Sequence, residues 1–220
     1  MKFEAIIFDL DGTLLDSLED LANSMNVVLH NFGFPTHKNE LYKTMIGDGI
    51  EMLVRRAIPK EVESSNKLND IIDTVKAEYG KRWEDKTRPF AGIEELIDFL
   101  IPNGIKLSIL SNKPHEFTII TTQKFFPDIP FYPIFGARKG YPKKPDPSQA
   151  LLISSTLQIP PEKTLFLGDS GTDMQTAKNA GMTPVGVLWG FRDFQELKSA
   201  GAVYFLKKPI ELTKIFENPV

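Results

Sequence analysis

Phe8-Asp-Leu-Asp-Gly-Thr-Leu-Leu-Asp-Ser17 is the stretch of this chain that decides its fold. It begins at the end of a short apolar run, residues 5–8, which predicts a buried strand that stops at Asp9. Asp9 and Asp11 are two residues apart, so their side chains face the same way in extended chain. Gly12 can supply a turn that other residues resist. The stretch therefore predicts a strand that carries two carboxylates at its carboxyl end.

The segment that follows this strand has helical periodicity. Apolar residues recur at helical spacing from Leu18 to Leu29, and Asn31-Phe-Gly-Phe-Pro35 ends that helix. Further helices are predicted at residues 41–46, 50–58 and 68–79, and no convincing strand lies between Asp16 and Asp85. We therefore expect residues 16–85 to form a small helical cap, inserted into a core built from residues 1–15 and 86–220.

Strands and helices alternate in the rest of the chain. Strands are predicted at 105–110, 131–135, 164–167 and 185–189, helices at 93–100, 116–125, 147–157 and 172–180, and residues 194–200, 203–206 and 210–216 complete the series. Such alternation is typical of a parallel sheet with helices on both faces. The predicted fold class is therefore α/β, a doubly wound parallel sheet with an inserted α-helical cap domain.

Composition narrows the possible functions. The chain has 220 residues, no cysteine and a net charge of −3, which excludes disulfides and thiolate chemistry and gives no sign of a nucleic-acid partner. No apolar segment approaches the roughly 18 residues of a membrane span, and the first apolar run is too short for a signal peptide. We expect a cytoplasmic protein without a membrane partner, either a monomer or a homodimer.

Polar side chains follow three of the predicted strands. The motifs are Asp9-Leu-Asp11, Ser111-Asn112-Lys113 and Gly168-Asp-Ser-Gly-Thr-Asp173, with Lys143-Lys-Pro-Asp-Pro147 between the last two. Ligands of open α/β sheets bind beyond the carboxyl ends of the strands. Each motif alone is more often a capped turn or a helix N-cap. Their arrival in order, at strand ends, favours a single functional site.

The chemistry of these motifs points to phosphate and a metal. Four carboxylates at one edge repel one another unless a cation neutralises them, and oxygen ligands of this kind suit Mg²⁺. The four are Asp9, Asp11, Asp169 and Asp173. Ser111 and Lys144 offer a hydroxyl and an ammonium to phosphate oxygens. With no Cys, and no His at a strand end, the remaining covalent nucleophile is a carboxylate that forms an aspartyl-phosphate.

The four motifs resemble those of the haloacid dehalogenase-like hydrolase superfamily, and the match covers nearly the whole chain. The resemblance implies a Rossmann-like core and a cap after the first motif. Within the superfamily the chain is similar to the phosphoglycolate phosphatase group, on the segments Asp16–Ala22, Ile46–Leu53 and Ser111–Pro114. It departs from that group at Ala91, where proline is usual, and at Gly136-Ala-Arg138, where Gly-Gly-Asp is usual.

The resemblance implies a magnesium-dependent phosphatase acting on a small phosphorylated substrate. In it Asp9 attacks phosphorus, while Asp11 protonates the leaving alkoxide and then deprotonates the hydrolytic water. Mg²⁺ is held by the Asp9 carboxylate, the Asp11 backbone carbonyl and Asp169, with Asp173 as a ligand or through water. The catalytic Lys144 and the metal stabilise the transferring phosphoryl group. Ser111, the Asn112 backbone N–H and Lys144 hold phosphate oxygens.

The sequence offers fewer candidates for contacts with the rest of the substrate than for contacts with its phosphate. Gly47-Asp48-Gly49 is interpreted either as a loop that drops onto the substrate or as a plain turn between helices. Lys113 directly follows Ser111-Asn112, so it is a candidate for binding a substrate carboxylate. Arg55 and Arg56 are further candidates for that carboxylate, although a solvated helix face is the favoured interpretation for both. The histidines receive no role; they are His30, His37 and His115.

Three other functions stay open. A sugar-phosphate phosphomutase re-uses the aspartyl-phosphate, and a pyrophosphatase shares these motifs closely. The segment Asp16–Ala22 favours a phosphatase over a mutase. A non-catalytic phospho-acceptor module also carries an acidic cluster and a phosphorylated Asp at a strand end, but such modules are smaller and lack an inserted cap.

Overall fold

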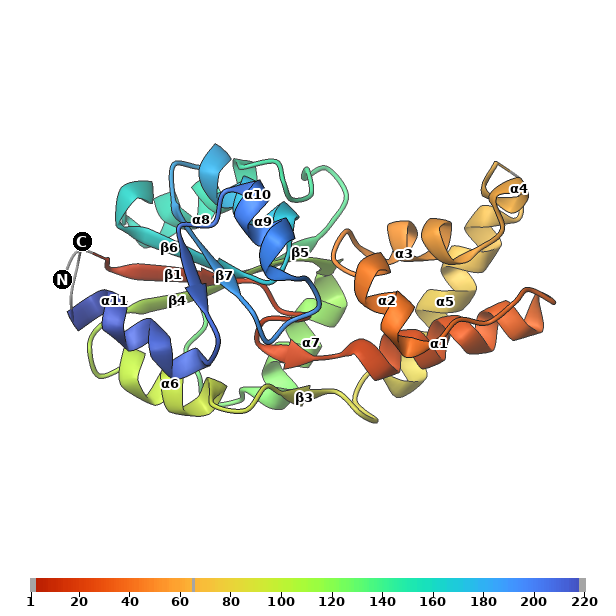
Figure 1. The fold of residues 1–220 in the computed structure, drawn as a ribbon, viewed down its shortest axis with the longest axis horizontal. Coiled ribbons are helices and arrows are strands. Elements are labelled where there is room, and N and C mark those ends of the chain that lie inside the picture. The colour runs from red at the N-terminus through yellow and green to blue at the C-terminus, as the bar shows by residue number, and fades with distance from the viewer. Residues whose placement is uncertain (1–2, 65, 218–220) are drawn as a thin grey trace.

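A sheet of six parallel strands carries the site in this computed structural model, which describes residues 3–64 and 66–217 (Figure 1). The strands are β1 (Ala5–Phe8), β4 (Lys106–Pro114), β5 (Ile134–Ala137), β6 (Thr164–Gly168), β7 (Thr183–Val187) and β8 (Tyr204–Leu206). Their order in the sheet is β5-β4-β1-β6-β7-β8. The chain thus builds outward from β1 in one direction and then from β6 in the other, as in doubly wound sheets. The predicted α/β fold class is confirmed.

The point where the strand order reverses lies between β1 and β6. Phe8 of β1 pairs with Leu167 of β6, so the residues that follow both strands lie side by side. Asp9 follows Phe8, and Asp169 follows the last residue of β6. Doubly wound sheets bind their ligands at this reversal point. The topology therefore places two of the predicted carboxylates where a ligand is expected.

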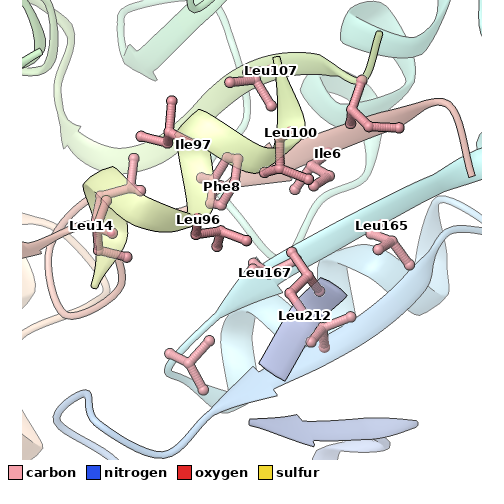
Figure 2. Close-up of a cluster of buried hydrophobic side chains, with 14 of the residues drawn as sticks. Ile6, Phe8, Leu14, Leu96, Ile97, Leu100, Leu107, Leu165, Leu167 and Leu212 are labelled. Carbon is pink, nitrogen blue, oxygen red and sulfur yellow. The ribbon is translucent and has the colours of Figure 1, made fainter. Parts of the chain in front are cut away.

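Helices cover both faces of the sheet, because side chains of successive strand residues point to opposite faces. Ile6 and Phe8 face the layer formed by α6 (Ile93–Leu100), η2 (Pro209–Leu212) and α11 (Thr213–Glu217), as Figure 2 shows in part. Ile7 faces the layer of α8 (Ser148–Leu157) and α9 (Gly171–Asn179). Burial of each such apolar side chain stabilises the fold by about 1.5–3 kcal/mol. The strand ends are consequently held by packed apolar clusters on both faces of the sheet.

The remaining helices of this part pack against the sheet or against its covering helices. The helix α7 (His115–Phe125) packs against β4 and β5, and α10 (Phe194–Ala200) packs against α9 and β7. A short 3₁₀ turn, η1 (Pro161–Lys163), leads into β6. The helix α7 begins two residues after Lys113, and α9 begins within the Gly168–Asp173 motif, so the positions of both helices fix the motifs at the sheet edge.

Five helices between β1 and β4 form a second hydrophobic cluster beside the sheet (Figure 1). They are α1 (Leu18–Asn31), α2 (Asn39–Met45), α3 (Ile50–Ala57), α4 (Lys60–Glu63) and α5 (Leu68–Arg82), called the helical region below. No helix in the described part of the chain is long and apolar enough to cross a membrane. The domain boundaries at residues 15/16 and 85/86 stay a proposal, and residues 1–2 and 218–220 of the predicted core lie outside the described residues.

Some predicted elements are displaced. The strand predicted at residues 131–135 is β5 at Ile134–Ala137, because Pro130 and Pro133 have no amide proton to give to a ladder. The strand predicted to end at residue 110 continues to Pro114, and β7 begins and ends two residues before its prediction. The antiparallel pair β2 (Leu15–Asp16) and β3 (Arg88–Pro89) was not predicted, since strands of two residues show no periodicity.

Candidate active site

Three buried carboxylates meet at the reversal point of the sheet. One oxygen each of Asp9, Asp169 and Asp173 lies within 4.8 Å of the others. Asp9 and Asp169 come from the ends of β1 and β6, and Asp173 stands in the first turn of α9. The structure thus brings together three of the four predicted carboxylates. The carboxylate of Asp11 is not a member of this cluster.

A buried lysine, Lys144, faces the cluster. Lys144 Nζ lies 2.8 Å from Asp9 Oδ1 and donates a hydrogen bond of 2.6 Å to Asp173 Oδ1, and its side chain is only 2% exposed. Burial alone lowers a lysine pKa, but Asp173 and Asp9 outweigh burial and raise the pKa of Lys144. Lys144 therefore stays charged, and one cation opposes three carboxylates.

The carboxylates remain short of positive charge. Burial raises the pKa of Asp9 to about 7 even against the attraction of Lys144, and burial together with Asp173 and Asp9 raises the pKa of Asp169 well above its ordinary value. Asp9 Oδ1 is fully buried. It lies only 2.8 Å from Lys144 Nζ, but the two groups are not aligned for a hydrogen bond. A buried, under-compensated set of carboxylate oxygens fits a hard divalent cation.

Two glycines leave room for Asp169. A Cβ at Gly12, whose φ is +89°, would lie 2.3 Å from Asp169 Oδ2, and a Cβ at Gly190 would lie 2.2 Å from Asp169 Cβ. The Phe191 N–H donates to Asp169 Oδ2 at 2.8 Å. The predicted turn at Gly12 is confirmed, and the close approach to Asp169 gives a second reason for glycine there.

Asp11 lies in a separate polar network. Its Oδ1 accepts hydrogen bonds from Ser17 Oγ at 2.7 Å and from Lys113 Nζ at 2.9 Å. Lys113 Nζ also donates to the hydroxyl of Tyr79 at 2.6 Å. Lys113, predicted to meet a substrate carboxylate, thus binds two protein groups in this structure. Tyr79 lies on α5 and was not predicted, because its helical spacing marks it as a core residue.

The second motif, Ser111-Asn112-Lys113, lies within β4, and its side chains make different contacts. Ser111 Oγ accepts the Lys113 N–H at 3.2 Å and lines the cavity described below, so its own proton can reach a ligand. The Asn112 side chain instead holds the loop of Lys144: its Oδ1 accepts the Lys144 N–H at 2.9 Å, and its Nδ2 reaches the carbonyl oxygens of Lys144 and Gly47. Asn112 therefore connects the sheet to the helical region.

A cavity of about 30 Å³ lies between the sheet and the helical region. On the sheet side Asp9, Asp11, Ser111, Lys113 and Pro114 line it. On the helical side the lining consists of Leu21, Ile46, Gly47, Gly49, Ile50, Leu53 and Tyr79. A space of this size admits only a small ligand unless the helical region moves. The candidate nucleophile and acid thus open onto one small, mostly apolar chamber.

The predicted Gly47-Asp48-Gly49 loop divides its residues between the cavity and the sheet. Gly47 and Gly49 line the cavity, whereas Asp48 pairs with Arg56 and accepts a hydrogen bond of 2.9 Å from Thr172 of α9. Burial tends to raise the pKa of Asp48, but the contacts with Arg56 and Thr172 lower it. Arg192 also donates to the Ile46 carbonyl at 2.6 Å. These contacts tie the loop to the sheet part of the molecule.

The other charged candidates lie outside the cavity. Arg55 pairs with Glu51 at 3.0 Å on the surface of α3, in agreement with a solvated helix face. A ring nitrogen of His37 lies 2.7 Å from the Ala57 carbonyl oxygen, and His115 Nδ1 accepts the Gly136 N–H at 3.2 Å. Those two histidines are structural contacts rather than plain surface residues, and neither lines the cavity.

Replacement of Gly49 by alanine is expected to lower kcat/KM by about tenfold or more, because a strained residue here costs about 1–3 kcal/mol. Gly49 has φ +88°, and a Cβ would lie 2.8 Å from the Asn112 carbonyl oxygen. The added methyl group therefore pushes the loop away from the sheet. Steady-state kinetics of Gly49→Ala measures the effect.

Gly33→Ala is the matched control for this loss. Gly33 also has a positive φ, +74°, in the helical region, but nothing lies within 4 Å of its Cβ position. The control is expected to lose some stability and to keep its kcat/KM. Equal kinetics for the two variants would show that the contact between Gly49 and Asn112 is unimportant for turnover.

Comparisons with known proteins agree with this geometry. The sequence model of the haloacid dehalogenase-like hydrolases matches residues 6–187. The chain is 32% identical over 194 residues to a phosphoglycolate phosphatase of Pseudomonas syringae pv. tomato, covering 84% of the chain and 70% of the relative. It is 31% identical over 205 residues to a phosphoglycolate phosphatase of Psychrobacter arcticus, covering 90% and 89%.

A solved structure agrees over nearly the whole chain. The crystal structure of a predicted phosphoglycolate phosphatase from Haemophilus somnus 129PT superimposes with a TM-score of 0.90 at 27% identity, covering 98% of this chain and 99% of the other. The likeness includes both the sheet and the helical region, since less than a tenth of either chain is left out.

Proposed function

Because the chain belongs to the haloacid dehalogenase-like hydrolase family, we propose that it is a Mg²⁺-dependent phosphatase that hydrolyses a small, phosphoglycolate-like phosphate monoester. The observation that carries this proposal is the buried pair of Asp9 and Lys144, in which Asp9 lines a small cavity together with Asp11. A carboxylate held beside a cation in a water-poor site suits attack on phosphorus. The named relatives support phosphoglycolate as the type of ester.

The first step transfers the phosphoryl group to Asp9. A carboxylate oxygen of Asp9 forms a bond to phosphorus, and the bond from phosphorus to the ester oxygen breaks. Asp11, which lines the same cavity, gives its proton to the leaving alkoxide. Lys144 offsets the charge that gathers on the phosphoryl oxygens, and the Ser111 hydroxyl holds one of them.

The second step hydrolyses the aspartyl-phosphate. Asp11 takes a proton from a water molecule, whose oxygen attacks phosphorus and releases inorganic phosphate with the Asp9 carboxylate. Because Asp11 serves first as acid and then as base, its position must stay fixed between the steps. The contacts from Ser17 and Lys113 provide that position.

The donor set for the metal consists of Asp9 and Asp169 with the Asp11 backbone carbonyl, and Asp173 directly or through water. Bound there, Mg²⁺ supplies positive charge for the carboxylates and the phosphoryl oxygens. Asp173 also accepts hydrogen bonds from the N–H and hydroxyl of Ser170 at its second oxygen. Those bonds fix the direction in which its other oxygen, the one that Lys144 contacts, faces the cluster.

Mg²⁺ is expected to raise the melting temperature more at pH 8 than at pH 5. Because the pKa of Asp9 is raised to about 7 and that of Asp169 is also raised, the metal-free folded protein holds extra protons at pH 5. These protons compete with the cation, and at pH 8 Asp9, with a pKa of about 7, has mostly lost its proton. A saturating cation, at about 100 times its Kd, adds about 2.7 kcal/mol of stability.

Thermal melts at both pH values, with Mg²⁺ and with EDTA, measure this effect. Asp169→Asn removes one proposed ligand and is expected to lose most of the Mg²⁺ shift at pH 8. A shift that is the same at both pH values, or that survives in Asp169→Asn, would contradict the assignment of the site.

The proposed activity is tested by phosphate release from a panel of substrates. The panel contains 2-phosphoglycolate, pyrophosphate, glucose 6-phosphate and p-nitrophenyl phosphate, each with Mg²⁺ and with EDTA. Metal-dependent release with the highest kcat/KM for 2-phosphoglycolate supports the proposal. A preference for pyrophosphate would make the chain a pyrophosphatase, and no release from a folded protein would point to a mutase or a non-catalytic phospho-acceptor.

A further inference from the structure

The hydroxyl of Tyr79 is a polar group in the cavity that the mechanism does not use. Tyr79 is 1% exposed, lines the cavity and accepts a hydrogen bond from Lys113 Nζ at 2.6 Å. A phenol can donate one hydrogen bond as well as accept one. Across residues 3–64 and 66–217, no acceptor is bound to the Tyr79 proton. A buried donor without an acceptor is costly, which suggests that a ligand supplies one.

Lys113 itself has no proton left for a ligand. Its ammonium lies 2.9 and 3.1 Å from the two Asp11 oxygens and 2.6 Å from the Tyr79 hydroxyl, and an ammonium has three protons. The side chain is 2% exposed. Tyr79 therefore offers a ligand the hydrogen-bond donor that Lys113 cannot, and Lys113 acts on the ligand as a nearby charge.

Apart from Tyr79, the side chains on the helical side of the cavity are the aliphatic groups of Leu21, Ile46, Ile50 and Leu53. A sugar would lose hydrogen bonds of its hydroxyl groups to water against these side chains and gain none. The cavity of about 30 Å³ is also small, which favours a short leaving group. The leaving group that fits is short, with one polar end directed at Tyr79.

Resting on the phosphatase activity proposed above, the geometry points to Tyr79 as the residue that binds a carboxylate on the carbon next to the ester bond. Asp11, which lies beside the ester oxygen in the proposed mechanism, shares Lys113 with Tyr79. The oxygens of such a carboxylate lie three bonds beyond the ester oxygen, where one of them can accept the Tyr79 proton. The hydrogen bond from Lys113 polarises the Tyr79 hydroxyl, so an anionic acceptor is favoured over a neutral one.

The environment of Tyr79 holds it ready for this role. Its ring packs edge-to-face against Phe117 of α7 at 5.1 Å, and the Lys113 ammonium lies 4.7 Å from the ring centre. Burial raises the pKa of Tyr79 to about 12, so the hydroxyl keeps its proton at any working pH. Tyr79 also belongs to α5, which leads back toward β3 (Figure 1). A substrate carboxylate would thus join the helical region to the catalytic groups of the sheet.

Binding of two phosphonates tests the inference without turnover. The probes are 3-phosphonopropionate, which has a carboxylate where the leaving group ends, and propylphosphonate, which has a methyl group there. Calorimetry in Mg²⁺ buffer is expected to give a lower Kd for the carboxylate probe with the wild type. Tyr79→Phe should weaken the carboxylate probe by about tenfold or more and leave the methyl probe nearly unchanged.

Tyr42→Phe is the matched control, since Tyr42 is a second fully buried tyrosine of the helical region whose hydroxyl donates to Asn26 instead. This variant is expected to bind both probes like the wild type. If Tyr79→Phe weakened both probes equally, or neither, its hydroxyl would have only a structural role and the inference would fall. Failure of the wild type to bind the carboxylate probe would overturn it as well.

The substrate panel separates this inference from the proposed activity. Selective binding of the carboxylate probe through Tyr79, with no phosphate release from any substrate, would refute the phosphatase while the carboxylate site stands. Rapid hydrolysis of 2-phosphoglycolate by Tyr79→Phe, with the KM of the wild type, would refute the site while the phosphatase stands.

Discussion

Asp9→Asn is expected to lower kcat by at least about 10⁴-fold, the scale on which loss of a covalent nucleophile acts in other enzymes. The amide keeps the shape of the carboxylate but cannot attack phosphorus. Asp9 lies at the end of β1, 2.8 Å from Lys144, and faces the cavity, whereas the nearby Asp11 is held by Ser17 and Lys113. Phosphate release under single-turnover conditions measures the loss directly.

The stability of Asp9→Asn distinguishes lost chemistry from lost folding. The pKa of Asp9 is raised from 3.8 to about 7, so the folded protein favours the protonated form. In the absence of metal, stability is therefore lost as the pH rises through this interval. Asparagine mimics the neutral form, and Lys144 keeps its bond to Asp173. The variant should melt no lower than the wild type at pH 8 in EDTA.

Asp98→Asn serves as the matched control for this experiment. Asp98 lies on the exposed side of α6, so the same replacement there should change neither activity nor melting temperature. If Asp9→Asn kept a substantial part of the wild-type kcat, another group would be the nucleophile, and the aspartyl-phosphate mechanism proposed here would be wrong.

The sequence predicts the sheet side of this site well, for a topological reason. Asp9 and Asp169 each follow a recognisable apolar strand, and the strand ends of a parallel sheet meet at one edge. The position of Lys144 can also be predicted from the local sequence, because Lys144 precedes α8, the helix that packs against β4. The resemblance to the haloacid dehalogenase-like hydrolases rests on these same motifs, and the family match confirms it.

The contacts between the sheet and the helical region could not be predicted in the same way. Tyr79 and Lys113 are separated by 34 positions, and they meet only because the helical region brings α5 to the end of β4. In the sequence Tyr79 fits the apolar stripe of its helix, so periodicity assigns it to the core. Lys113 was correctly placed near the site, but its contact with Asp11 depends on rotamers that no sequence pattern encodes.

Lys144→Met is expected to be the most destabilising change in the site, with a loss of about 3–5 kcal/mol, the cost of removing one partner of a buried ion pair. Lys144 faces both Asp9 and Asp173, and no other cation is in hydrogen-bond contact with either carboxylate in the described residues. Methionine fills the space but leaves the carboxylates unopposed. Urea unfolding at pH 8 in EDTA measures the loss of stability.

Two comparisons test this prediction: the same measurement at acid pH, and a control variant at the adjacent lysine. The defect should shrink from pH 8 to pH 5, because Asp9 already has a raised pKa of about 7 and becomes neutral when protonated. Lys143→Met alters the neighbouring, exposed lysine and should cost little. At temperatures where it is folded, Lys144→Met should also lose about 10²–10³-fold in kcat, since charge stabilisation at phosphorus is gone. Wild-type stability and activity in this variant would mean that the three carboxylates do not need Lys144, and the charge balance on which the proposed site rests would be wrong.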